Sequence, residues 1–297
     1  MQLIKILAVK NLLGEGIVWH PDQQSLWWTD ILTCKLYCYE WQHNNLIHYA
    51  LPERLGCFGF TKDSQQIIAA FASGIALYNL NTSEVKWLAR PELYNKGNRF
   101  NDGGVDRLGR FWAGTMVENK QLSTAEGKLY YLKSNGECCV ALDNIGISNA
   151  LCWSTNGEGV YHADSPSHSI FKYQFDNDKG LVNKQLFAET ASGQVPDGAC
   201  IDSIGHLWSA QWGGAQVIEY DIHGCAQQVI QLPVSQPTCV AIGGPNLDLL
   251  CITSAQQGLS KYELAKQPQA GNVFIYQLEE SLGVNEVFLN TSGYSAI

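Results

Sequence analysis

The sequence has few charged side chains, and basic ones are the scarcer. Asp, Glu, Lys and Arg make up 16% of the 297 residues, and 19 Lys and Arg against 28 Asp and Glu give a net charge of −9. No cluster of Lys and Arg occurs anywhere along the chain. Because a polyanion partner needs a basic surface, the composition predicts no nucleic-acid partner, and the acidic excess suits a cation.

Long apolar runs are also missing. No run approaches the roughly 20 residues that a membrane-spanning helix requires. The first ten residues are faintly like a signal peptide, but Lys5 interrupts their apolar core, Lys10 ends it, and no small-x-small cleavage site follows. We expect a strand at residues 3–9 and a soluble, cytoplasmic protein with no membrane partner.

Two catalytic or metal-binding motifs are absent. The ten cysteines include no CxxC pair, so a thiolate zinc site is not expected, and their scatter through apolar runs is typical of small buried side chains in a reducing compartment. No Gly-x-Ser-x-Gly motif occurs, and the repeat described next places no histidine beside Ser148 or Ser165. Serine nucleophile chemistry is therefore not expected.

What the sequence does contain is a repeat, most distinct at residues 99–116. A polar residue opens a short apolar strand, a turn follows, and a second strand rich in aromatic and small residues comes next. The steps between successive repeats are 41, 45, 48, 48 and 41 residues, counted along Glu15, Gly56, Asn101, Asn149, Asp197 and Thr238. This period, with several short strands per repeat and no helical periodicity, predicts an all-β, six-bladed β-propeller that forms one domain over residues 1–297.

In a propeller, the first strand of each blade lines a central channel. The six residues that open the repeats should therefore form a ring, in which two carboxylates (Glu15 and Asp197) and two amides (Asn101 and Asn149) converge. Such an oxygen-rich set suits Ca²⁺, Mg²⁺ or Mn²⁺, and Zn²⁺ remains possible. Arg99 lies two residues before Asn101, so both side chains should point to the same side, where a guanidinium could hold a hydroxylated or anionic ligand or form an inter-blade salt bridge.

Closure and loops can also be predicted. The segment at residues 3–9 should pair with the last blade, whose own strands are expected at 238–242, 248–253 and 272–278, although residues 287–289 could compete for that place. Residues 91–98 should cross over the channel, and residues 117–127 should form a polar loop near its mouth. We expect His162 to be a buried core or rim histidine. Several aspartates are expected to cap turns instead of binding a ligand: Asp30, Asp102, Asp106, Asp164 and Asp202.

Six short motifs together resemble the gluconolactonase/regucalcin family, also called the senescence marker protein family. They are Gly14-Glu15-Gly16, Arg99-Phe100-Asn101-Asp102-Gly103, Ala113-Gly114-Thr115-Met116, Ile147-Ser148-Asn149, Ala163-Asp164-Ser165 and Pro196-Asp197-Gly198. The resemblance runs from residue 12 to residue 278, and the motifs stand in the family's order and spacing.

This resemblance implies a propeller that holds one divalent cation with Glu15, Asn149 and Asp197. It also implies that Arg99 and Asn101 contact the substrate and that Asp197 is the general base. Regucalcins carry two consecutive acids after the Ala-Gly-Thr-Met motif, where this chain has Glu118 and then Asn119. Asn119 matches the acid that contacts the sugar, so either residue could contact substrate here.

The expected function is hydrolysis of a sugar lactone, such as L-arabinono- or D-glucono-lactone, to its aldonic acid by a monomer or weak dimer. The alternatives are a non-catalytic calcium-binding propeller and a hydrolase of organophosphate-like esters. Within the ring, Asp197 has a shorter side chain than Glu15 and follows Pro196, whose fixed φ holds the start of the strand. We therefore expect Asp197 to accept the proton of the attacking water.

Overall fold

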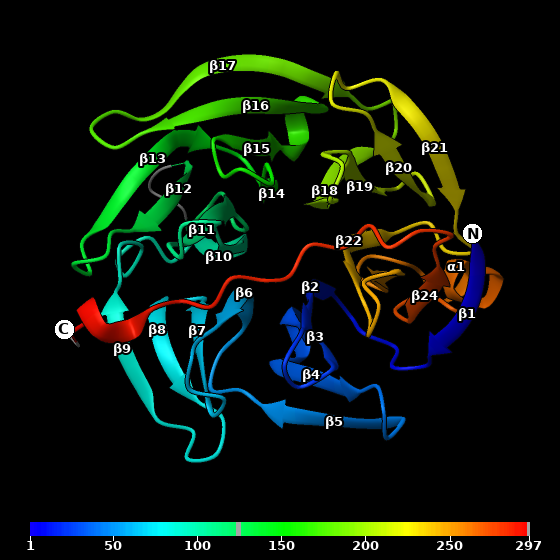
Figure 1. The fold of residues 1–297 in the computed structure, drawn as a ribbon, viewed down its shortest axis with the longest axis horizontal. Helices are drawn as coiled ribbons and strands as arrows, with labels where there is room; N and C mark the ends of the chain where they lie inside the picture. The colour runs from blue at the N-terminus through cyan, green and yellow to red at the C-terminus, as the bar shows by residue number, and fades with distance from the viewer. Residues whose placement is uncertain (123–125, 296–297) are drawn as a thin grey trace.

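A computed structural model describes residues 1–122 and 126–295. Six antiparallel sheets of four strands surround a central axis and follow one another in chain order around it (Figure 1). This arrangement confirms the six-bladed propeller predicted from the repeat.

In the first five blades, four consecutive strands pair in chain order. Blade one consists of β2 (Gly14–His20), β3 (Ser25–Asp30), β4 (Lys35–Glu40) and β5 (Asn45–Ala50). Blade two consists of β6 (Leu55–Phe60), β7 (Gln66–Phe71), β8 (Gly74–Asn79) and β9 (Val85–Ala89). Blade three consists of β10 (Asn98–Val105), β11 (Phe111–Val117), β12 (Gly127–Leu132) and β13 (Cys138–Ile145).

The later blades repeat the pattern. Blade four consists of β14 (Ser148–Trp153), β15 (Gly159–Asp164), β16 (Ser169–Asp176) and β17 (Gly180–Glu189). Blade five consists of β18 (Val195–Ile201), β19 (Leu207–Trp212), β20 (Gln216–Tyr220) and β21 (Ala226–Gln231). Blade six contains β22 (Pro237–Gly243), β23 (Leu249–Ser254), β24 (Val273–Gln277) and β1 (Gln2–Leu7). The described residues also form four short helical segments in different parts of the chain: α1 (Lys261–Lys266), η1 (Ile31–Thr33), η2 (Ser165–Ser167) and η3 (Thr291–Gly293).

The N-terminal strand closes the ring. β1 pairs antiparallel with β24, so that Leu7 lies opposite Val273 at one end of the pairing. This confirms that the start of the chain completes the last blade and covers an edge that would otherwise be exposed. Residues 287–289 do not compete for that place, because the amide of Leu289 donates to the carbonyl of Phe60 in blade two, at 2.8 Å.

Burial follows the distance of each strand from the axis. The inner strand β14 is buried throughout, whereas most residues of the outermost strand β21 are exposed. Aromatic rings fill the space within and between blades: Trp112 stacks on Tyr131 within blade three, with ring centroids 4.9 Å apart, and its ring lies 6.4 Å from that of Trp153 in blade four. Such broad faces bury much apolar surface between sheets.

Two loops meet near one end of the channel. The crossover predicted at residues 91–98 contains turns up to the start of β10 at Asn98, and the carbonyl of Gly97 accepts from the amide of Glu118 at 2.9 Å. Residues 118–122 form no helix, as predicted for the insertion, while 123–125 lie outside the described residues. Within the described ranges, no helix is both long and apolar enough to cross a membrane.

Candidate functional site

Each inner strand carries a β-bulge at its ring position. In blade four, Asn149 pairs with Ala163 and Cys152 pairs with Tyr161, so three steps on the inner strand match two on its neighbour. All six inner strands have one such extra residue beside the ring. A bulge redirects a side chain, and the residues directly after two ring positions, Gly16 (φ 58°) and Ala150 (φ 51°), adopt the left-handed conformation. The same β-bulge therefore recurs in every blade at the position that faces the channel.

Four of the six ring side chains line one cavity of about 240 Å³. These are Glu15, Asn101, Asn149 and Asp197, and Arg99 joins them. The other two ring positions contribute no polar group to this cavity: Gly56 has no side chain, and the Thr238 hydroxyl donates to the carbonyl of Gly14. The remaining lining residues are Leu13, Met116, Ile147, Ser165, Val195, Trp212 and Gln257.

The carboxylates at this cavity are buried, and other carboxylates lie near them. Burial, together with the nearby charge of Asp102, raises the pKa of Glu15 to about 8. Burial, followed by the charges of Glu15 and Asp102, raises the pKa of Asp197 well above its ordinary value, although Arg99 acts in the opposite direction. Each carboxylate therefore makes ionisation of the others less favourable, as expected for like charges in a buried site.

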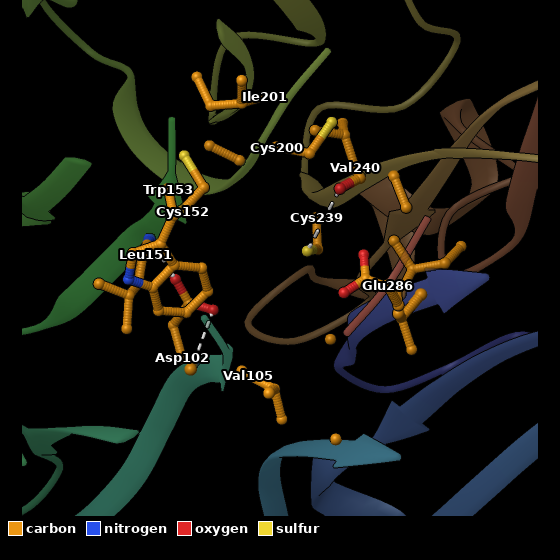
Figure 2. Close-up of a pocket in the computed structure, with 18 of the residues that line it drawn as sticks. Asp102, Val105, Leu151, Cys152, Trp153, Cys200, Ile201, Cys239, Val240 and Glu286 are labelled. Carbon is orange, nitrogen blue, oxygen red and sulfur yellow. Dashed lines mark hydrogen bonds between the residues drawn. The ribbon is translucent and has the colours of Figure 1, made fainter. Parts of the chain in front are cut away.

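Asp102 does more than the turn cap predicted from the sequence. Its carboxylate accepts from the backbone amides of Gly103 and Leu151, both at 2.8 Å, which are cap contacts. The same side chain also lines a second cavity of about 100 Å³ inside the channel, shown in Figure 2, and burial raises its pKa to about 7. The prediction that Asp102 only caps a turn was therefore incomplete, because the bulge in β10 also directs its side chain towards the channel.

The C-terminal segment lies against this inner cavity. It crosses the propeller face as the red trace in Figure 1, and Val284, Glu286 and Val287 line the cavity. Glu286 lies across the cavity from Asp102 in Figure 2, and burial raises its pKa. Arg107 secures the segment through a hydrogen bond from Nη1 to the carbonyl of Asn285, at 3.0 Å. The repeat gave no indication of this segment, because it lies outside the blades.

The residues present fit a divalent cation. Glu15, Asn149 and Asp197 offer hard oxygen donors at one cavity, and a cation between them would offset both the burial and the like-charge repulsion that raise the two carboxyl pKa values. The guanidinium of Arg99 is already engaged with Asn101 and Glu118. A bound cation would supply the positive charge that the ionised forms of Glu15 and Asp197 lack.

Glu118 lies between two guanidinium groups. Its carboxylate accepts from Arg99 Nε at 3.0 Å and from Arg54 Nη1 at 2.7 and 2.8 Å. Burial raises the pKa of Glu118, but the two arginines outweigh burial and hold it below its usual value. The side chain of Asn119 instead accepts from the amide of Gln121 in an exposed turn. Glu118, and not Asn119, is thus joined to the residues of the cavity.

Arg54 was missed by the sequence analysis, although the repeat contained the signal. It stands two residues before the ring position Gly56, as Arg99 stands two residues before Asn101. Because the blades are related by rotation about the channel, the two arginines occupy equivalent places in neighbouring blades.

A serine and a histidine do meet, contrary to the expectation from the repeat. Ser148 Oγ lies 2.9 Å from His162 Nε2. Ser148 lies opposite Asp164 in the pairing of β14 with β15, so His162 reaches it diagonally from two residues along β15, a contact that the spacing of the repeats does not reveal. Both side chains are buried, as predicted for His162, and neither lines the cavity at the ring. The Ser148 hydroxyl lies against Gly114 of blade three, so the pair is buried where blades three and four meet and is separate from the lining of the ring cavity.

The other predicted caps accept backbone hydrogen bonds. Asp30 accepts from the amides of Leu12 and Leu13, and Asp164 accepts from those of Gly146 and Ile147. Asp106 and Asp202 each close a turn and accept from a tryptophan indole two residues into the next strand.

Asp202 also belongs to a cluster with His206 and Glu219 whose ligand atoms lie within 4.8 Å of one another. The carboxylate of Asp202 already accepts three N–H donors, and His206 Nδ1 lies 2.7 Å from Glu219. Asp106 and Arg110 form the same turn in blade three. The cluster is therefore part of a turn that recurs in blades three and five, and we interpret it as structural.

Comparisons with known proteins identify the family and agree with the fold. The family model described as "SMP-30/Gluconolactonase/LRE-like region" matches residues 13–256. The chain is 38% identical to 6-deoxy-6-sulfogluconolactonase of Pseudomonas putida over 91% of this chain and 92% of that protein, and 33% identical to L-arabinolactonase of Azospirillum brasilense over 93% and 92%. The solved structure of a calcium-binding protein, regucalcin from Agrobacterium tumefaciens, superposes with a TM-score of 0.88 at 28% identity, over 97% of this chain and 98% of that one.

Proposed function

The chain belongs to the SMP-30/gluconolactonase/LRE-like family, and from this premise we propose that it hydrolyses a small sugar lactone to its aldonic acid with the help of one divalent cation. The observation that carries the proposal is the composition of the ring cavity. Oxygen donors of Glu15, Asn149 and Asp197 share it with Arg99 and Asn101. A protein that only stores calcium has no use for the last two.

Two groups at the cavity keep unused hydrogen-bonding capacity. Arg99 has five N–H donors, of which Nε and both protons of Nη1 are engaged, so Nη2 is left for a ligand among the described contacts. Asn101 uses both Nδ2 protons on Ser148 and Asn149, and its Oδ1 accepts from Arg99. One lone pair of that oxygen remains. Arg99 can therefore donate to the lactone or its developing oxyanion, and Asn101 can accept from a ring hydroxyl.

A divalent cation held by Glu15, Asn149 and Asp197 would supply Lewis-acid polarisation of the lactone carbonyl. Asp197 then accepts the proton that the attacking water loses as it adds to the carbonyl carbon. The same carboxylate can return this proton to the ring oxygen when the C–O bond breaks, which leaves the open hydroxy acid. Arg99 stabilises charge on the carbonyl oxygen, and the apolar wall, which includes Met116 and Trp212, limits the access of other water.

A lactone panel tests the proposal. We would assay D-glucono-, L-arabinono- and 6-deoxy-6-sulfo-D-gluconolactone with Ca²⁺, Mn²⁺, Mg²⁺ or Zn²⁺, using a phosphotriester as the control substrate. The expected result is hydrolysis of at least one lactone well above its spontaneous rate, loss of that rate with a chelator, and no comparable rate on the phosphotriester. Rates equal to spontaneous hydrolysis with every metal would overturn the proposal and favour a calcium-binding role.

A further inference from the structure

A chain of hydrogen bonds crosses the cavity from blade three to blade five. Arg99 Nη1 donates to Asn101 Oδ1 at 2.7 Å, and Asn101 Nδ2 donates to Asn149 Oδ1 at 2.9 Å. Asn149 Nδ2 then donates to Ser165 Oγ at 2.9 Å, and Ser165 donates to the carbonyl of Pro196 at 2.8 Å. Each hydrogen bond in this chain is donated in the same direction, from blade three towards blade five.

The two ends of the chain fix this direction. A guanidinium can only donate and a peptide carbonyl can only accept, so neither Arg99 nor Pro196 permits reversal. Reversing the amide of Asn149 alone would bring its NH₂ group against the NH₂ group of Asn101 and leave the Ser165 hydroxyl without a donor. Each amide therefore has one satisfied orientation.

Ser165 connects two of the proposed metal ligands, because it accepts from Asn149 and donates to the carbonyl of the residue before Asp197. Its hydroxyl hydrogen is committed to the carbonyl of Pro196, so its lone pairs face Asn149 and accept the NH₂ group there. This leaves Asn149 Oδ1, with one lone pair free, on the side that faces Asn101. Pro196 directly precedes Asp197, so the second bond steadies the peptide that carries the carboxylate.

The position of Ser165 suits this task. It opens the 3₁₀ turn η2 directly after Asp164, the last residue of β15, and the residue is 2% exposed. Asp164 in turn holds residues 146 and 147 through two hydrogen bonds to their amides. The hydroxyl thus projects from a backbone that is itself fixed against the strand carrying Asn149.

We propose that Ser165 is a positioning residue that selects the metal-binding orientation of Asn149 and couples it to Asp197. This inference rests on the proposed function only for the identity of the ligands. Without the hydroxyl, Asn149 Nδ2 loses its acceptor and the carbonyl of Pro196 loses its donor. Because partners of metal ligands typically contribute 10–100-fold to metal affinity, Ser165→Ala should weaken binding of the metal by about that factor.

Ser148→Ala is a matched control. Ser148 is equally buried and adjacent to Asn149, but its hydroxyl contacts His162 and takes no part in the chain. Its backbone carbonyl, which accepts from Asn101, is unchanged by the substitution. Ser165→Thr restores a hydroxyl and should recover most of the affinity.

The experiment measures two quantities on the folded full-length variants. The first is the dissociation constant of Ca²⁺ or Mn²⁺, from calorimetric titration. The second is the set of side-chain amide NMR signals of selectively ¹⁵N-labelled asparagine in the metal-free protein, where Ser165→Ala should shift and deprotect those of Asn149 while Ser148→Ala should not.

Each outcome is decisive. Weaker metal binding and altered Asn149 signals in Ser165→Ala alone, with recovery in Ser165→Thr, support the inference. Wild-type affinity in Ser165→Ala, or equal losses in Ser165→Ala and Ser148→Ala, would overturn it. If the wild type binds no divalent metal, the metal-dependent function fails, and unchanged Asn149 signals in Ser165→Ala would then reject the orienting role separately.

Discussion

Removing the charge of Glu118 should destabilise the protein far more than removing that of Arg54, although the two residues form one ion pair. Arg99 is only 3% exposed and its ion-pair partner is Glu118, whereas Arg54 and Glu118 are each 34% exposed. Glu118→Gln therefore leaves a buried guanidinium without its counter-charge. Arg54→Ala leaves Glu118 still paired with Arg99 and open to water.

The magnitudes follow from burial. Breaking a fully buried pair costs about 3–5 kcal/mol, and breaking an exposed one costs about 0–1 kcal/mol. Because water reaches a third of Glu118, and because glutamine can still accept from Arg99 Nε, we expect Glu118→Gln to cost about 2 kcal/mol. With an unfolding entropy of about 2.1 cal/mol/K per residue, this corresponds to a fall in Tm of about 3 °C. Arg54→Ala should cost below about 1 kcal/mol.

Thermal and urea unfolding of both variants in the presence of a chelator would provide the measurement, since a bound cation would otherwise add its own effect on stability. The expected order is wild type, then Arg54→Ala close below it, then Glu118→Gln. Equal losses in the two variants would refute the argument, because they would show that Arg99 does not depend on Glu118 for its charge balance.

Two further predictions concern the cavity and blade four. Arg99→Ala should lower kcat in steady-state lactone kinetics more than it raises KM, because Arg99 is proposed to stabilise the charge that develops on the carbonyl oxygen in the transition state, and a raised KM with unchanged kcat would contradict this. Burial lowers the pKa of His162 to about 3, so below its ordinary value of 6.5 the unfolded state binds more protons than the folded state. The free energy of unfolding should therefore fall by about 2 kcal/mol through this residue between pH 7 and pH 5, and His162→Gln should remove that part of the pH dependence in urea titrations.

The blades were predictable because each blade packs against its neighbours in the same way, which produces the same sequence pattern in every repeat. An inner strand buried on both faces and a regular spacing of polar openings were enough to place Asn149 and Asp197 at one channel, and even to predict that the first strand closes the last blade. These features depend on local sequence and on the repeat, and both can be recognised in one sequence without a structure.

The partners of these residues were less predictable. Ser165 reaches Asn149 from the turn after the next strand, and Arg54 reaches Glu118 from another blade. Such contacts depend on the bulges and on the rotation between blades, and neither is encoded by strand periodicity. The dual position of Asp102 has the same origin, since its carboxylate both caps backbone amides and faces the channel.

The measurement that tests the central claim most directly is the turnover of Asp197→Asn with its metal bound. The substitution keeps the shape of the side chain and one oxygen ligand but removes the group that accepts the proton. We predict a loss of about 10²-fold or more in kcat on the best lactone, with metal binding still measurable by titration. Near wild-type kcat in a metal-loaded Asp197→Asn protein would contradict the account, because the proton of the attacking water would then have to be accepted elsewhere.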